Sequence, residues 1–196
     1  MKATILIIVS LFCTIVLPAQ TYYYNETKTF YEDGYTYQCD KPSWGLITLY
    51  NKDNKHTYNE TFYYKNDTPV EDTDILWGRT KLLEDDNWTR QTCFSIVNAA
   101  FSDAEVQRLK GQKFDVNMTI DSSTGKVIEV DFRFHYTSPA ATIPVSTYRK
   151  IELDLKEKIW FTPTPVGKQM KVLITGWMHE IKPPMNIDTS ITLPRI

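Results

Sequence analysis

The sequence has no surplus of positive charge. It carries 22 Lys and Arg residues against 24 Asp and Glu residues in a chain of 196, which gives a formal net charge of −2. Proteins that bind nucleic acids or anionic membrane surfaces through charge present an excess of basic residues. We therefore expect neither nucleic acid nor an anionic membrane surface as a partner.

Histidine and catalytic motifs are also scarce. The three histidines, His56, His135 and His179, share no spacing typical of metal ligands. No nucleophile-elbow, P-loop, dinucleotide-binding or zinc-protease motif is present. The acidic runs 71–74 and 84–86 lack the spaced oxygens and the glycine of calcium loops, so we interpret both as solvated loops. We expect no metal and no cofactor.

One compact set of titratable residues lies on a single face of a predicted strand: Glu129, Asp131, Arg133 and His135. An exposed strand face seldom provides the two shielded carboxylates, with separated pKa values, that acid–base catalysis requires. We therefore assign no catalytic residues and favour a protein that is not an enzyme.

Cysteine is limited to three residues, and Cys13 falls in the apolar N-terminal segment. The remaining pair, Cys39 and Cys93, has no C-x-x-C spacing that would indicate a metal site. In an exported chain two cysteines favour a disulfide, which would stabilise the fold by roughly 4 kcal/mol. The alternatives are a reactive thiol or two buried free thiols.

Long apolar runs are absent after the N-terminus. Residues 1–19 combine Lys2, an apolar stretch from Ala3 to Val16, and Pro18 and Ala19 before a cleavage point. This order is typical of a cleaved export signal and predicts a mature chain starting near Gln20. An uncleaved anchor helix and a lipid anchor on Cys13 are the alternatives. We expect an exported protein in the periplasm, at the outer membrane or outside the cell.

The first part of the mature chain, residues 20–92, is rich in tyrosine. It predicts an antiparallel β segment: a hairpin over 27–39 with an Asp33–Gly34 turn, a second hairpin over 45–65, and a strand over 75–83. Tyrosine and tryptophan can also stack on sugars or on a partner protein. The residues for such a surface are Tyr22, Tyr23, Tyr24, Trp44, Trp77 and Trp88.

The second part, residues 93–183, predicts a helix, a hairpin, a helix and a strand, followed by a tail over 184–196. Ser102 and Glu105 have the spacing of a capping box for the first helix. The second helix carries an apolar stripe that must pack on the apolar face of the hairpin. The whole chain is therefore predicted to be α+β, with its helices on one face of an antiparallel sheet, and a single domain over residues 20–183 is the alternative to two separate parts.

Three stretches of this second part resemble the C-terminal domain of TonB-type energy transducers. They are the strand and turn in MTIDSSTGKVIEVDF, the helix end in YRKIELDLKEKIWFTP, and the closing strand in GKQMKVLITGWM. The resemblance covers about 101–181 and implies the helix–hairpin–helix–strand fold. It also implies that a partner could add an extended strand at 171–181. The chain has no long proline-rich spacer, so energy transduction is not implied. The whole chain also resembles the small exported bacterial proteins of uncharacterised families.

These observations predict a non-catalytic exported binding protein of the bacterial cell envelope, with a protein or a glycan as its partner. A carbohydrate-binding module that uses tyrosine and tryptophan surfaces is the alternative. A hydrolase acting through carboxylates is a third, less favoured interpretation.

Overall fold

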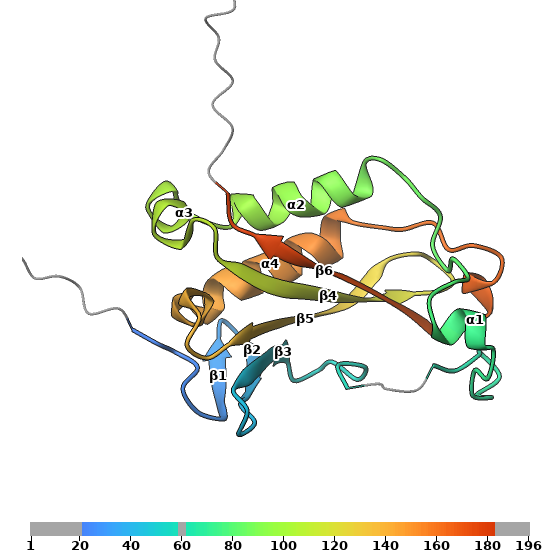
Figure 1. Cartoon of the computed structure of the whole chain (residues 1–196), viewed down its shortest axis with the longest axis horizontal. Helices are drawn as coiled ribbons and strands as arrows, with labels where there is room; N and C mark the ends of the chain where they lie inside the picture. The colour runs from blue at the N-terminus through green and yellow to red at the C-terminus, as the bar shows by residue number, and fades with distance from the viewer. Residues whose placement is uncertain (1–20, 59–61, 183–196) are drawn as a thin grey trace, which may run out of the picture.

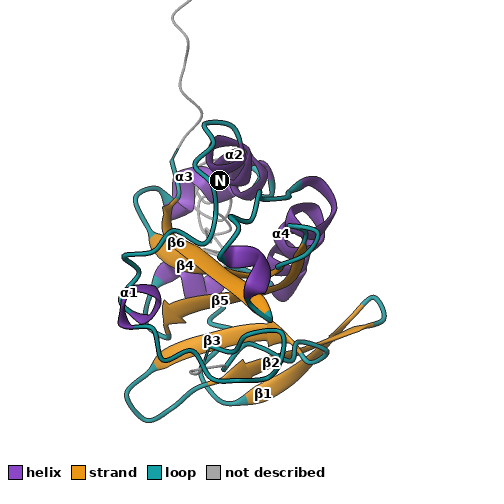
Figure 2. Cartoon of the chain, turned by 90° about the vertical axis from the view of Figure 1, so that its right-hand side faces the viewer, coloured by secondary structure: helices purple, strands orange, loops and turns teal. Residues whose placement is uncertain are grey.

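The computed structural model describes residues 21–58 and 62–182. Six strands form one antiparallel sheet in the order β1-β2-β3-β5-β4-β6. Their bounds are β1 Lys28–Glu32, β2 Tyr35–Asp40, β3 Leu46–Asn51, β4 Lys113–Asp121, β5 Val127–His135 and β6 Val172–Glu180. Figure 2 shows the strands stacked in this order, from β6 at the top to β1 at the bottom. Both parts of the chain therefore contribute to one sheet.

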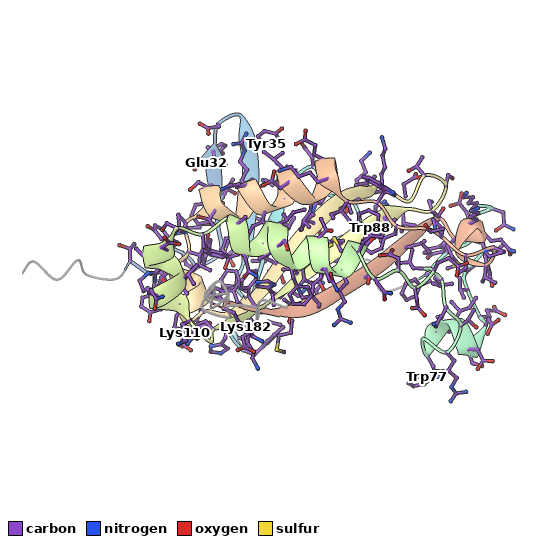
Figure 3. The ribbon with its side chains drawn as sticks, turned by 90° about the horizontal axis from the view of Figure 1, so that it is seen from above. Glu32, Tyr35, Trp77, Trp88, Lys110 and Lys182 are labelled. Atoms are coloured by element: carbon purple, nitrogen blue, oxygen red, sulfur yellow. The ribbon has the colours of Figure 1, made fainter. Side chains whose placement is uncertain are left out.

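Four α-helices accompany the sheet in the described residues: α1 Thr73–Leu76, α2 Thr89–Ala99, α3 Asp103–Leu109 and α4 Val145–Lys158. Two short 3-10 helices are η2 Pro139–Thr142 and η3 Gly167–Gln169. Helices α2 and α4 lie side by side over the same face of the sheet (Figures 1 and 3). The α+β class with helices on one face of an antiparallel sheet is confirmed.

The core is centred on the helix predicted to carry an apolar stripe. The four stripe residues, three in α4 and Ile159 directly after it, are almost completely buried, at 0–1 % exposure: Tyr148, Ile151, Leu155 and Ile159. The Tyr148 ring stacks on Phe134 of β5, with 5.4 Å between ring centroids. Burial of such side chains is the main driving force for folding, so α4 holds the sheet and helix layers together.

The elements predicted for 101–181 occur in the expected order as α3, β4, β5, α4 and β6. Ser102 and Glu105 form the capping box at the start of α3. One detail differs: the β4–β5 register shifts between Thr119 and Ile120, which places Val127 opposite Ile120. Such a bulge adds one residue to a strand and changes which side chains face the core after it.

The first part matches its prediction only at the first hairpin. Asp33 and Gly34 have positive φ values of 41° and 82°, as a two-residue type I′ turn requires. The predicted second hairpin is wrong, because β3 pairs with β5 from the second part instead of with a local return strand. The strand predicted over 75–83 is also wrong. Asp72 caps α1 by accepting from the backbone N–H groups of residues 74 and 75.

Helix α2 was missed, and the boundary predicted between residues 92 and 93 falls inside it. The signal was present in the spacing of its buried residues: Thr89, Cys93, Ile96 and Val97. The helix lacks a capping side chain at the residue before it, Trp88. Asp86 supplies the cap instead, accepting from the Thr89 N–H at 2.6 Å.

The strand face carrying Glu129 and Asp131 is covered, which corrects the expectation of an exposed face. Glu129 is 8 % exposed and accepts from the backbone N–H groups of Lys55 and His56 at 2.7 and 2.9 Å. Burial raises the pKa of Asp131, which accepts from Arg133 Nε at 3.1 Å. Glu129 directly, and Arg133 through the Thr57 carbonyl, hold the 52–58 loop against the sheet.

The predicted export signal at 1–19 and the predicted tail at 184–196 lie outside the described residues. Within residues 21–58 and 62–182, none of the helices has both the length and the apolar character needed to cross a bilayer.

Candidate functional site

A cleft of about 280 Å³ lies where the start of α2 meets strands β4 and β6. We call it the α2 cleft. Its lining comes from four separate segments: Leu83, Glu84, Asp85, Asp86, Thr89, Arg90, Cys93, Met118, Phe161, Thr175, Gly176 and Trp177. Buried Thr89, Cys93 and Met118 form its floor, and exposed charged residues stand at its rim.

Backbone hydrogen bonds hold the rim of the α2 cleft in place. The Glu84 N–H donates to the Thr162 carbonyl at 2.8 Å, and Leu83 forms a β-bridge with Pro163. Asp86 then fixes the start of α2 through its contacts with Thr89. Glu84 and Asp85 are exposed loop residues, as the sequence predicted, and the run 84–86 also forms part of the rim of the cleft.

Three of the five tryptophans in the chain lie at this cleft or beside it. Trp88 and Trp160 neighbour the lining residues Thr89 and Phe161, and their ring centroids are 5.1 Å apart. Both remain exposed, at 43 % and 54 %. Trp177 lines the cleft and stacks on Phe94 of α2 with 5.6 Å between centroids. Exposed aromatic rings beside a concave surface provide flat apolar contacts for a ligand.

The charged side chains at the rim differ in whether they already bond to other groups of the protein. Asp85 pairs with Lys81, and Asp86 caps α2. Within the described residues, the side chains of Glu84 and Arg90 make no hydrogen bond or ion pair, and the Arg90 guanidinium carbon lies 5.9 Å from the centroid of the Phe94 ring. Glu84 and Arg90 are therefore available to bind the hydroxyl or charged groups of a ligand.

Cys93 at the floor of the cleft is not an active nucleophile. It is 2 % exposed, and burial, with a further contribution from the Asp86 charge, raises the pKa of its thiol to about 12. Thiol chemistry requires the thiolate form, which is negligible at neutral pH for such a group. Cys93 therefore lines the cleft as a protonated thiol.

The predicted disulfide between Cys39 and Cys93 is not formed in this structure, where both thiols are free and buried. Cys39 lies in β2, and Cys93 lies in α2 over β4 and β6. Strands β2 and β4 are three strand spacings apart, or about 14 Å, while a disulfide requires Cα atoms within about 7 Å. The third alternative, two buried free thiols, is the arrangement observed.

The six aromatic residues singled out from the sequence do not form one surface. Tyr24 is a core residue at 0 % exposure, and its hydroxyl donates to the Ile143 carbonyl at 2.9 Å. Tyr23 packs against the core, whereas Tyr22 is exposed. Trp44 is exposed in the loop between β2 and β3. Figure 3 shows Trp77 well separated from Trp88, which leaves Trp88 as the one member of the set beside the α2 cleft.

No group of three or more His, Cys, Asp or Glu side chains in residues 21–58 and 62–182 is arranged to hold a metal ion. His179, for which the sequence indicated no functional role, bonds to the lining residue Trp177. It is fully buried, its Nε2 lies 3.0 Å from Asn98 Oδ1, and its Nδ1 accepts from Trp177 Nε1 at 3.2 Å. This arrangement requires a neutral ring with its proton on Nε2, and it orients the Trp177 ring in the cleft.

This arrangement predicts that acid weakens the fold at His179. Burial, with a smaller effect of the Lys182 charge, lowers the pKa of His179 from 6.5 to about 4. Between these values the unfolded chain binds a proton that the folded chain excludes. The free energy of unfolding therefore falls as the pH drops from about 6.5 to 4, by up to about 3 kcal/mol.

Urea unfolding of the wild type and of His179→Gln at pH 7 and pH 4.5 checks this prediction. The carboxylates titrate equally in both proteins, so the contribution of His179 is the difference between their pH dependences. We expect the wild type to lose about 2–3 kcal/mol more than the variant. Equal losses would contradict the prediction.

Known proteins resemble this chain over most of its length. The family described as "Domain of unknown function (DUF5043)" matches residues 20–177. The crystal structure of a DUF5043 family protein from Bacteroides uniformis ATCC 8492 is 36 % identical, with a TM-score of 0.75, and the match covers 84 % of this chain and 91 % of that chain. No match was found among curated proteins.

The comparisons support the resemblance to an uncharacterised family. The resemblance to the TonB C-terminal domain is not confirmed, although the order of elements that it implied is present. Its motifs are turns and core positions, which unrelated α+β proteins can share. The family match and the similar solved structure agree: the chain belongs to the DUF5043 family.

Proposed function

We propose that the protein is a non-catalytic exported binding protein of the bacterial cell envelope, with the α2 cleft as its binding site. The observation that carries this proposal is a cleft lined by Trp177, Glu84 and Arg90, with the exposed Trp88–Trp160 pair adjacent in the chain to the lining residues Thr89 and Phe161. The composition of residues 1–19 supports export, and the related protein from Bacteroides uniformis supports a bacterial setting.

The chemistry of the cleft supports binding rather than catalysis. Asp85 and Asp86 are held by Lys81 and by the start of α2, so Glu84 is the one lining carboxylate without a partner in the described part of the chain. Hydrolysis of a glycosidic bond generally requires two carboxyl groups at a fixed separation, flanking that bond. The protonated Cys93 thiol offers no alternative nucleophile.

A carbohydrate is the ligand class that these side chains favour. The apolar face of a sugar ring stacks on tryptophan, while its hydroxyl groups bond to carboxylate and guanidinium groups such as those of Glu84 and Arg90. A volume of about 280 Å³ is at the small end for ligand sites. We therefore expect recognition of one or two sugar units, with the chain of a larger glycan continuing past the Trp88–Trp160 pair.

A glycan array probed with residues 20–196 tests this function. We expect binding to a restricted group of glycans, and a loss of affinity of about tenfold or more in Trp88→Ala and in Glu84→Gln. Trp77→Ala is the matched control, because Trp77 is more exposed, at 76 %, and lies away from the cleft. An empty array, or equal losses in Trp77→Ala and Trp88→Ala, would contradict carbohydrate binding at the cleft.

A further inference from the structure

Strand β6 forms one edge of the sheet and lacks the features that usually protect an edge. In the described residues it pairs with β4 alone, and seven consecutive residues from Val172 to Met178 carry neither a charge nor a proline. The opposite edge, β1, has five residues and is charged at both ends by Lys28 and Glu32. Natural proteins keep exposed edges short, charged or covered, because a long apolar edge pairs with other chains.

The side chains of β6 that face away from the helices are apolar and exposed. Ile174 is 39 % exposed and Met178 is 61 % exposed. Both point to the same face because they are four residues apart in a strand, with Gly176 between them. The alternate residues Thr175 and Trp177 point to the α2 cleft on the other face. The outer face that carries Ile174 and Met178 is therefore opposite to the face of β6 that lines the α2 cleft.

We propose that β6 pairs antiparallel with β6 of a second copy of this chain, about a two-fold axis at Gly176. In this register Ile174 of each copy lies opposite Met178 of the other, so four exposed apolar side chains are covered together. Directly opposite side chains in antiparallel strands are close enough to contact. The two sheets become one continuous sheet across the interface.

The charge pattern favours a second copy as the occupant. Two-fold pairing brings equivalent segments together, so a strand with charges near its centre risks placing like charges opposite each other. The centre of β6 has none, and Glu180 at its end lies opposite Val172 of the other copy. His179, opposite Leu173, is neutral at pH 7 because burial lowers its pKa to about 4. An isologous interface therefore forms without electrostatic repulsion along the strand.

Sedimentation velocity on residues 20–196 between about 1 and 100 μM tests the pairing. The range extends to high concentration because a single strand pair is a small interface, and small interfaces are generally weak. The wild type is expected to dimerise. The double variant I174K/M178K places Lys opposite Lys at two positions, and I174E/M178E places Glu opposite Glu, so each should be monomeric alone. Mixed together, they place Lys opposite Glu at both positions and should form a one-to-one dimer.

Tyr31→Lys is the matched control, because Tyr31 is 82 % exposed on the opposite edge strand and its change should leave the dimer intact. Circular dichroism verifies that the variants fold, since both altered side chains are exposed. A chain that ends at Lys182 should also dimerise. A monomeric wild type, a mixture that stays monomeric, or a dimer lost on removal of 183–196 would each overturn the proposal. Trp88→Ala and Glu84→Gln, the array variants, lie outside β6, so a loss of glycan binding and a loss of the dimer are distinguishable.

Discussion

Tyr148→Ala is expected to lower the free energy of unfolding by about 3–5 kcal/mol, the usual loss when a large buried aromatic side chain is removed from a core. The Tyr148 side chain is 0 % exposed and lies among rings from β4 and β5. Its ring centroid is 4.7 Å from that of Phe132, 5.4 Å from that of Phe134 and 5.7 Å from that of Phe114. Alanine would leave a cavity between α4 and the sheet that these rings cannot fill.

Urea denaturation followed by circular dichroism measures this loss, because the midpoint and slope give the free energy of unfolding. Tyr148→Phe is the matched control. It keeps the ring and removes only the hydroxyl, which donates to the Ala140 carbonyl at 3.1 Å, so the expected loss is about 1–3 kcal/mol. A loss below about 1 kcal/mol in Tyr148→Ala would mean that α4 does not anchor the core.

Glu152→Ala is expected to be the next most damaging change, at about 2–4 kcal/mol. Glu152 is completely buried in α4, and its carboxylate accepts hydrogen bonds from three groups. These are the Tyr37 hydroxyl of β2, Asn51 Nδ2 of β3 at 3.5 Å, and Lys156 Nζ at 3.3 Å. Removal of the carboxylate leaves the first two donors buried without a partner, and each such group costs about 1–3 kcal/mol.

Urea denaturation followed by circular dichroism also measures the loss in Glu152→Ala, and Asp154→Ala is the matched control. Asp154 pairs with Lys158 one turn along the same helix at 2.5 Å, but that pair is partly exposed to solvent and should contribute about 1 kcal/mol or less. Burial and the Glu152 charge raise the pKa of Tyr37, so its hydroxyl stays a donor at neutral pH. Equal losses in Glu152→Ala and Asp154→Ala would show that the buried network adds nothing.

Both positions act at the junction between the two parts of the chain. Ordinary domains are stable by only about 5–15 kcal/mol, so either change removes a large share of the total. Glu152 connects α4 to β2 and β3, which come from the tyrosine-rich first part. We therefore expect both variants to weaken the single sheet as a whole rather than one half of it.

The α2 cleft could not be predicted from the sequence because its lining comes from four separate segments. Trp88 was selected as a candidate, but its neighbour Trp160 is more than 70 residues away in the chain. Asp86 belongs to an acidic run whose sequence indicates a loop, and in the structure it also caps α2, a helix absent from the predicted elements. A single sequence without known contacts gives no reason to place these three residues together.

Where local chemistry was sufficient, the sequence determined the structure. The Asp33–Gly34 turn follows from two residues that tolerate positive φ, and the start of α3 follows from the capping box of Ser102 and Glu105. The apolar spacing of α4 identified the helix and its buried face together. Each of these features depends on residues within a few positions of one another, and the α+β class follows from their sum.

Tertiary structure alone decided the long-range features. It paired β3 with β5, separated Cys39 from Cys93 by three strand spacings, and buried Tyr24 while leaving Tyr22 exposed. Among the described residues, it also left β6 at the edge of the sheet, with Trp177 in the lining of the α2 cleft. The physical reason is that strand order and side-chain burial depend on contacts between residues far apart in the chain, and no local pattern in one sequence specifies those contacts.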